Sequence, residues 1–131
     1  MEINTVAGRE EYSSIGALVH PSIQGAGRQT QRVASTTIDD LVRIHGIHPG
    51  FIKIDVEGAE HRVLRGADAA LRTHRPVVLS ELSTTLLAQN GSSAAEVVAY
   101  MESRGYDVVD PLNPSGRFVA REFGDMLCVP R

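Results

Sequence analysis

The segment FIKIDVEGAEHRVLRG, residues 51–66, limits the possible folds more than any other part of the chain. Its first six residues are mostly apolar, as in a β-strand that is buried on both faces of a sheet. Asp55 and Glu57 stand where this strand would end, and Gly58 follows them. An amphipathic helical pattern then runs over 58–71. A buried strand that leads through a short turn into such a helix is the repeating unit of α/β proteins.

The chain after residue 35 alternates between strand and helix patterns in the same way. Thr36 or Thr37 can cap a helix that Gly46 would end, and Ser93 and Glu96 have the spacing of a capping box. We therefore predict an α/β fold with a mostly parallel sheet, helices on both faces and an antiparallel C-terminal edge. The expected elements are a helix ending at 46, a strand at 51–56, a helix at 58–71, a strand at 76–82, a helix at 93–104, a strand at 106–110 and two short strands within 116–130.

Residues 1–35 show less patterning and are rich in glycine, serine and glutamine. Short strands are expected at EINTVA, residues 2–7, and at RVAS, residues 32–35. The GAG sequence at 25–27 follows no convincing strand and lacks the third glycine of a nucleotide-binding loop. We expect a single domain over 1–131, with a loop-rich segment before residue 36 and an α/β core after it.

Composition narrows the class of protein. The chain has 131 residues and a net charge of -3, and its basic residues form no cluster, so a nucleic-acid partner is not expected. Cys128 is the single cysteine, which excludes a disulfide within the chain and agrees with a reducing compartment. No apolar run is long enough to span a membrane, and no signal peptide is visible. We therefore expect a cytoplasmic protein with no membrane partner.

The candidate site lies where two strands end. Ligands of open α/β sheets bind beyond the carboxyl ends of the strands. Asp55 and Glu57 follow the strand at 51–56, and Glu81 stands near the end of the strand at 76–82. If these strands are neighbours, about 5 Å apart, the three acids meet at one rim. Gly58 would allow a tight turn and a close approach of backbone to a ligand.

Neighbouring residues have plainer explanations. Glu57 and Glu60 would also gain from the positive end of a helix dipole, which explains Glu60 better than a role in chemistry and Glu57 equally well. Lys53 lies on the same side of its strand as Asp55, so an internal ion pair that positions Asp55 is expected. No histidine spacing indicates a metal site, and Cys128 on a presumed edge strand is expected to be inert.

Longer stretches of the chain resemble the FkbM-type methyltransferase family. The resemblance is strongest in FIKIDVEGAEHRVLRGADAALRTHRPVVLSEL, where KIDVEGAE is a fairly specific match. It extends back through TTIDDL at 36–41 and EEYSSIGALVH at 10–20, and forward to DMLCVP at 125–130. Most of the chain is thus covered.

The resemblance implies a partial Rossmann-like methyltransferase fold that uses S-adenosylmethionine and methylates a hydroxyl of a sugar or secondary metabolite. It places Asp55, Glu57 and Glu81 at the methyl-transfer site, with Asp55 and Gly58 as the candidates for cofactor contact. An acid there could orient the acceptor hydroxyl or take its proton. The acids could instead hold a divalent cation that polarises the hydroxyl. Acceptor specificity would come from the loops at 8–31 and 83–92.

One part of the family pattern has no counterpart here. Nothing before residue 36 supplies the glycine-rich first strand and loop that hold the cofactor, so we expect a domain truncated at its N-terminal side. The strand at 51–56 would then be an exposed sheet edge, open to a second copy or a partner chain. The chain is therefore expected to be an O-methyltransferase that is inactive alone, or else a non-catalytic assembly module or half of a split enzyme. A magnesium-dependent phosphate-handling enzyme is a weaker alternative, because no phosphate-binding loop accompanies the acids.

Overall fold

The computed structural model describes residues 1–6 and 27–131, so most of the loop expected at 8–31 falls outside the described residues. These residues form two units, Met1–Ser35 and Thr36–Arg131. The first contains β1, Glu2–Val6, and β2, Arg28–Arg32, which pair antiparallel. The strand expected at 32–35 therefore lies earlier, at β2. Asn4 and Thr30 face each other in this pair, and the Thr30 hydroxyl donates a hydrogen bond of 2.8 Å to Asn4 Oδ1.

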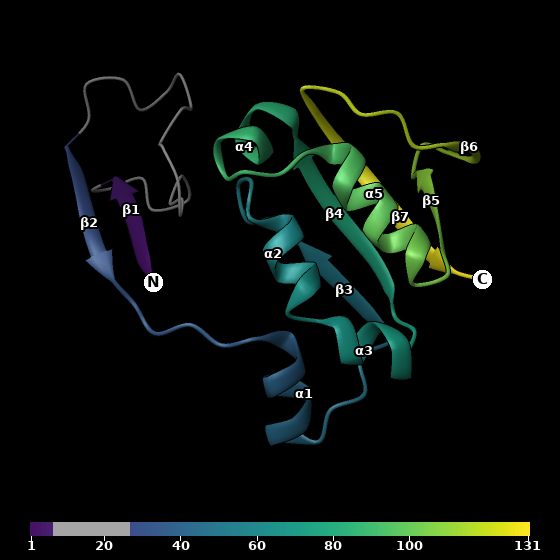
Figure 1. The fold of residues 1–131 in the computed structure, drawn as a ribbon, viewed down its shortest axis with the longest axis horizontal. Coiled ribbons are helices and arrows are strands. Elements are labelled where there is room, and N and C mark those ends of the chain that lie inside the picture. Colours follow the sequence, from purple (N-terminus) through teal and green to yellow (C-terminus); the bar gives the residue numbers. More distant parts are fainter. Residues whose placement is uncertain (7–26) are drawn as a thin grey trace. The chain divides into compact units, whose positions relative to one another are not determined.

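The second unit is a five-stranded sheet with helices between its strands (Figure 1). Its strand order is β3-β4-β7-β5-β6, in which β3 and β4 are parallel and the other neighbours are antiparallel. Its elements are α1 Ile38–His45, β3 Phe51–Ile54, α2 Glu60–Arg65, α3 Asp68–Thr73, β4 Val77–Ser83, α4 Thr84–Gln89, α5 Ala94–Ser103, β5 Tyr106–Asp110, β6 Asn113–Arg117 and β7 Phe123–Pro130.

This topology corrects the predicted C-terminal edge. The last strand, β7, lies inside the sheet between β4 and β5, and of the two C-terminal strands β6 alone is at an edge of the described sheet. The interior place suits β7 because Met126 and Cys128 are fully buried, whereas β6 has no buried residue. With β7 inserted, three of the four strand pairings are antiparallel, so the mostly parallel sheet is not confirmed.

Helices on both faces of the sheet were also predicted, but α2, α3, α4 and α5 lie over one face (Figure 1). The connections β3 to β4 and β4 to β5 step across the sheet in the same direction. Because such crossovers are right-handed, both place their helices on the same side. Burial therefore alternates along the strands: Val78, Ser80 and Leu82 of β4 are buried, whereas Glu81 is exposed.

The first predicted helix has the expected ends. Thr37 is the N-cap of α1 and accepts a hydrogen bond from the Asp40 amide, and Gly46 closes the helix in the left-handed conformation. The Ser93 cap of α5 is likewise confirmed, because its hydroxyl accepts the amide hydrogen of Glu96. These caps depend on neighbouring residues alone, which explains why the pattern revealed them.

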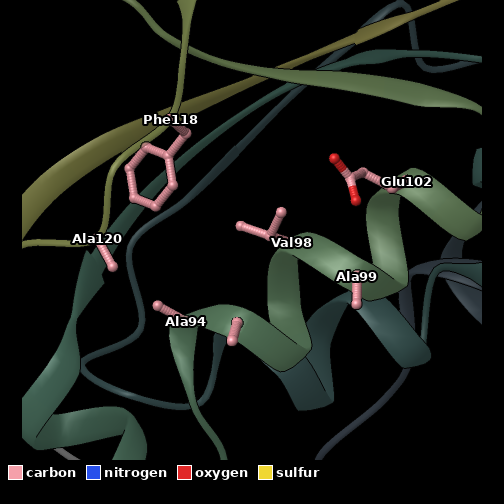
Figure 2. A pocket seen from close by; sticks show the side chains of 7 residues that line it. Ala94, Val98, Ala99, Glu102, Phe118 and Ala120 are labelled. Carbon is pink, nitrogen blue, oxygen red and sulfur yellow. The ribbon is translucent and has the colours of Figure 1, made fainter.

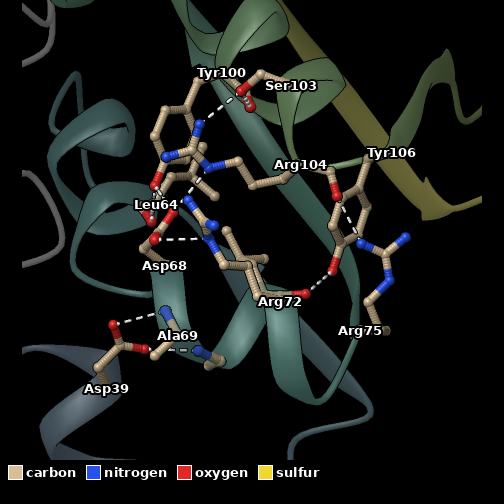
Figure 3. A network of polar contacts seen from close by, with 12 residues as sticks. Asp39, Leu64, Asp68, Ala69, Arg72, Arg75, Tyr100, Ser103, Arg104 and Tyr106 are labelled. Carbon is tan, nitrogen blue, oxygen red and sulfur yellow. Dashed lines mark hydrogen bonds and ion pairs between the residues drawn. The ribbon is translucent and has the colours of Figure 1, made fainter.

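The helix predicted at 58–71 is instead broken into α2 and α3 around Gly66. The Gly66 carbonyl accepts the amide hydrogen of Asp39 in α1. In return, the Asp39 carboxylate accepts the amide hydrogens of Ala69 and Ala70 at distances of 3.0 and 2.8 Å (Figure 3). The break thus lets α1 cap the start of α3, which a pattern of apolar residues does not reveal.

A polar network fastens α3 to α5 (Figure 3). Arg104 Nε and the Tyr100 hydroxyl donate hydrogen bonds of 2.8 and 2.9 Å to Asp68 Oδ1, and the Arg104 guanidinium stacks on the Tyr100 ring. The hydrogen bond from Arg104 is the main cause that lowers the pKa of Asp68. Because Asp68 stays ionised, it holds both partners over most of the pH range.

The core lies between α2–α5 and the covered face of the sheet. Leu64 of α2 is fully buried, whereas Leu112 is 90% exposed. The other largest fully buried apolar side chains among the described residues are Leu71, Val78, Leu82, Leu87, Val97, Met101, Tyr106 and Met126.

Truncating Leu64 tests this core. We expect Leu64→Ala to lower the free energy of unfolding by about 2–5 kcal/mol, because it leaves a cavity in packed surroundings. The matched variant Leu112→Ala should change it by less than about 0.5 kcal/mol. Urea denaturation of both variants measures the difference, and equal effects would contradict the described packing.

Candidate functional site

Asp55 stands just after the end of β3, and Glu81 stands near the end of the neighbouring strand β4, two residues before Ser83. In the parallel pair of β3 and β4, Ile54 is in register with Ser80. Asp55 and Glu81 each come one residue later, so both side chains are directed to the face opposite the helices. Both residues are exposed to solvent. The parallel pairing thus brings two of the three predicted acids to one rim.

A third carboxylate joins them from a residue that the sequence analysis missed. Asp125 of β7 is exposed and lies directly opposite Glu81 across the antiparallel pair with β4. Directly opposed like charges weaken a strand pair, so a feature other than pairing must favour this arrangement. We call Asp55, Glu81 and Asp125 the acidic row. Only the position of β7 inside the sheet could have revealed Asp125, and local pattern does not carry that information.

Lys53 forms an ion pair with Asp55, at one end of the acidic row. Its Nζ lies 3.3 Å from Asp55 Oδ2, so the predicted ion pair is present. However, it is not internal, because the two side chains are 62% and 45% exposed. Such a pair contributes at most about 1 kcal/mol and is screened by salt. Lys53 therefore orients Asp55 but does not remove its access to solvent.

Glu57 lies apart from the acidic row, in the turn between β3 and α2. Its φ of 50° is left-handed, and so is the φ of 96° at Gly58. The glycine is required for a second reason, since a Cβ there would lie 2.5 Å from the carbonyl oxygen of Leu86. The close approach at Gly58 is therefore to the backbone of α4, in the segment 83–92 that was expected to be a loop.

Glu60 differs most from its predicted role. It begins α2, as a residue favoured by the helix dipole would, but it is only 2% exposed. Its Oε1 accepts a hydrogen bond of 2.9 Å from the Gly58 amide, and its Oε2 has no hydrogen-bond partner among the described residues. Burial raises the pKa of Glu60, the amide hydrogen bond opposes this, and the nearby charge of Asp55 adds to the rise.

Other candidate groups have structural partners. His61 shares a hydrogen bond of 2.7 Å with Ser92, and His48 lies 3.3 Å from His74 between their Nδ1 atoms. Burial raises the pKa of Cys128 to about 12, which makes its thiol unreactive as predicted, although on an inner strand. Within residues 1–6 and 27–131, no three acidic, histidine or cysteine side chains are placed to hold a metal ion. The divalent cation left open by the sequence has no donor set there.

A hollow of about 290 Å³ lies elsewhere, between α5 and the segment after β6 (Figure 2). This is the low end of the range for ligand pockets, ~300–1,000 Å³. Glu102 is the one charged residue that lines it, and its carboxylate pairs with Arg117 at 2.9 Å. The remaining lining is apolar: Ala94, Ala95, Val98, Ala99, Phe118 and Ala120. The hollow therefore offers one carboxylate, which is paired with Arg117, whereas the acidic row brings several carboxylates together.

A match to a known protein family bears on the class of this protein. The family described as Methyltransferase FkbM domain matches residues 4–108, which include β3, β4 and the turn between β3 and α2. The chain belongs to the FkbM methyltransferase family. No curated protein and no solved structure matches the chain. None of the helices in the described residues of this FkbM family member is long and apolar enough to cross a membrane.

Membership of the FkbM family raises the question of the methyl donor, S-adenosylmethionine. A glycine that cradles a cofactor leaves space where a side chain would be. At Gly58 this space is taken by Leu86 and Asn90 of the protein itself. The residues described here therefore do not form a cofactor cradle at that turn, although the exposed carboxylate of Asp55 remains available to a hydroxyl group. We assign Gly58 to the shape of the turn.

Replacing Gly58 tests that assignment. Gly91 also has a left-handed φ, of 75°, but a Cβ there would meet nothing within 4 Å. Gly91→Ala should therefore cost only the conformational strain of about 1–2 kcal/mol. Gly58→Ala should cost more than about 3 kcal/mol, because the new methyl group also collides with backbone. Thermal unfolding of the two variants measures the difference, and similar losses would contradict the close contact with α4.

The buried Glu60 should make stability depend on pH. Its folded pKa is raised above 4.5, so its contribution to stability is full below 4.5 and is lost as pH rises through the folded value. The stability of wild type relative to Glu60→Gln should therefore fall with rising pH. Urea denaturation of both proteins between pH ~4 and ~8 measures this. A difference that stays constant or grows with pH would contradict the burial of this carboxyl.

Proposed function

We propose that this chain forms the acceptor side of an S-adenosylmethionine-dependent O-methyltransferase that acts on a hydroxyl of a sugar or secondary metabolite. The observation that carries the proposal is the pair of exposed carboxylates, Asp55 and Glu81, at adjacent strand ends in an FkbM family chain. A carboxylate accepts a hydrogen bond from a hydroxyl group and draws its proton away as the oxygen attacks an electrophile. Asp55 and Glu81 would orient the acceptor in this way.

The chemistry of the acidic row supports a polyhydroxylated acceptor. Asp55, Glu81 and Asp125 provide acceptor atoms only, while Lys53 adds a donor beside them. Sugars present several hydroxyl groups in fixed positions, and each can donate to one carboxylate. The acidic row is exposed, so water screens the repulsion between its carboxylates. The hydroxyl groups of a bound sugar would take the place of that water. The donor S-adenosylmethionine supplies an electrophilic methyl group when bound.

A second candidate, from a different class, is an assembly module or half of a split methyltransferase. Within the described sheet, β3 is an outer strand whose single neighbour is β4. Its other edge offers unpaired backbone donors and acceptors to a further strand. Phe51 of this strand is 57% exposed, which adds apolar area to the same edge. A second copy or a partner chain that adds a strand to β3 would complete the sheet.

Titration with S-adenosylhomocysteine, combined with measurement of mass in solution, tests both candidates. We expect binding at micromolar strength, with Leu112→Ala as a surface control that binds equally well. Binding that appears only in a dimeric fraction would favour the split enzyme. No binding by folded protein would contradict an independent cofactor site, and a strict monomer that also fails to bind would contradict both candidates.

A replacement in the acidic row separates the acceptor from the cofactor. If Asp55 and Glu81 orient the acceptor alone, Asp55→Asn and Glu81→Gln should keep the wild-type affinity for S-adenosylhomocysteine. Methyl transfer to a sugar acceptor, once one is identified by screening, should fall about 100-fold or more in these variants. A large loss of S-adenosylhomocysteine affinity would instead place the carboxylates in the cofactor site.

A further inference from the structure

The buried carboxylate of Glu60 has no place in the function proposed so far. It is 2% exposed, and its Oε1 accepts a hydrogen bond of 2.9 Å from the Gly58 amide, while backbone groups of Glu60 and Val56 also act to lower its pKa. Its Oε2 is buried without a partner among the described residues. Burying a carboxyl group that is only half satisfied costs free energy. A glutamate at this position therefore destabilises the fold compared with an apolar residue of the same size, unless it does something that such a residue cannot.

The hydrogen bond falls on the most strained part of the candidate site. Glu57 and Gly58 are consecutive and both left-handed, with φ of 50° and 96°. For Glu57 this conformation costs roughly 1–2 kcal/mol, because its Cβ crowds the following carbonyl group. The Glu60 carboxylate accepts the amide hydrogen of Gly58, two residues before it in the chain. This hydrogen bond thus holds the turn in its left-handed conformation, from which the chain would otherwise relax toward an extended one.

We propose that Glu60 is a positioning residue that locks the Glu57–Gly58 turn, which follows Asp55 at the carboxyl end of β3. The functional meaning of this role rests on the proposed function, but the hydrogen bond that holds the turn is present in the free protein. Glu57 is half-buried and lies two residues after Asp55, so a change in the turn would alter where its carboxylate stands. Local strain held in place by a neighbouring group is common where proteins bind ligands.

Two features of the surroundings favour a lock over simple filling of space. Gly58 also meets α4, since a Cβ there would lie 2.8 Å from Asn90 Nδ2, so the turn is fixed from two sides. Asn90 in turn donates a hydrogen bond of 3.0 Å to the Leu86 carbonyl oxygen. The carboxylate and α4 therefore hold the same glycine from different elements.

Hydrogen exchange distinguishes a residue that holds the turn by a hydrogen bond from one that only fills space. Glu60→Gln keeps an oxygen acceptor for the Gly58 amide, Glu60→Met keeps the volume without the acceptor, and Glu60→Asp keeps the charge on a shorter stem. If Glu60 is a lock, exchange at the Gly58 amide should quicken about tenfold in the Met and Asp variants and stay near wild type in Glu60→Gln. The Gly105 amide, bonded to Glu102 in a distant turn, should be unchanged in all three.

The same variants connect the lock to the site. Methyl transfer to the acceptor should be near wild type in Glu60→Gln and about tenfold slower in Glu60→Met, while both variants should bind S-adenosylhomocysteine as wild type does, because the turn forms no cofactor cradle. If wild type does not bind S-adenosylhomocysteine, the cofactor part of the proposed function fails, while the exchange at Gly58 still decides the lock. Equal protection of Gly58 in Glu60→Gln, Glu60→Met and Glu60→Asp would overturn the positioning role. So would wild-type rates of methyl transfer in variants whose Gly58 amide had lost protection.

Discussion

The arrangement of the second unit depends on the direction in which the chain crosses its sheet. The crossovers from β3 to β4 and from β4 to β5 step the same way, so right-handed connections place all their helices on one face. Apolar side chains must then gather on that face, where Leu64, Val78, Met101 and Tyr106 are completely buried. The other face of each strand is left for residues that tolerate water. Hydrophobic burial and the acidic row therefore follow from one constraint on chain direction.

The open face explains why the acids can stand together. Glu81 and Asp125 lie opposite each other on paired strands, an arrangement that would be costly in the core. On a solvated face, water screens their repulsion, so the remaining cost is small. A ligand that donates hydrogen bonds to both would replace that water and relieve the repulsion.

Local features of this fold could be read from sequence, and long-range ones could not. The Thr37 and Ser93 caps involve residues three positions apart, and Asp55 and Glu81 follow strands of clear apolar character. In contrast, the position of β7 depends on partners more than forty residues away, as in the pair of Glu81 and Asp125. Asp125 was missed for that reason. The break at Gly66 was missed because its cause is the backbone of α1, which no periodicity describes.

Glu57 and Glu60 show that sequence pattern does not separate the roles of two acids even within a single motif. Both are acids at the start of a helix, and the dipole favours both equally. Their roles differ because side chains at the start of a helix point back toward its N-terminus. A glutamate at position 60 is therefore long enough to return to the Gly58 amide, whereas Glu57 lies in the left-handed part of the turn itself. The spacing in VEGAE thus places the two acids in different surroundings, with Glu60 buried and Glu57 half-buried.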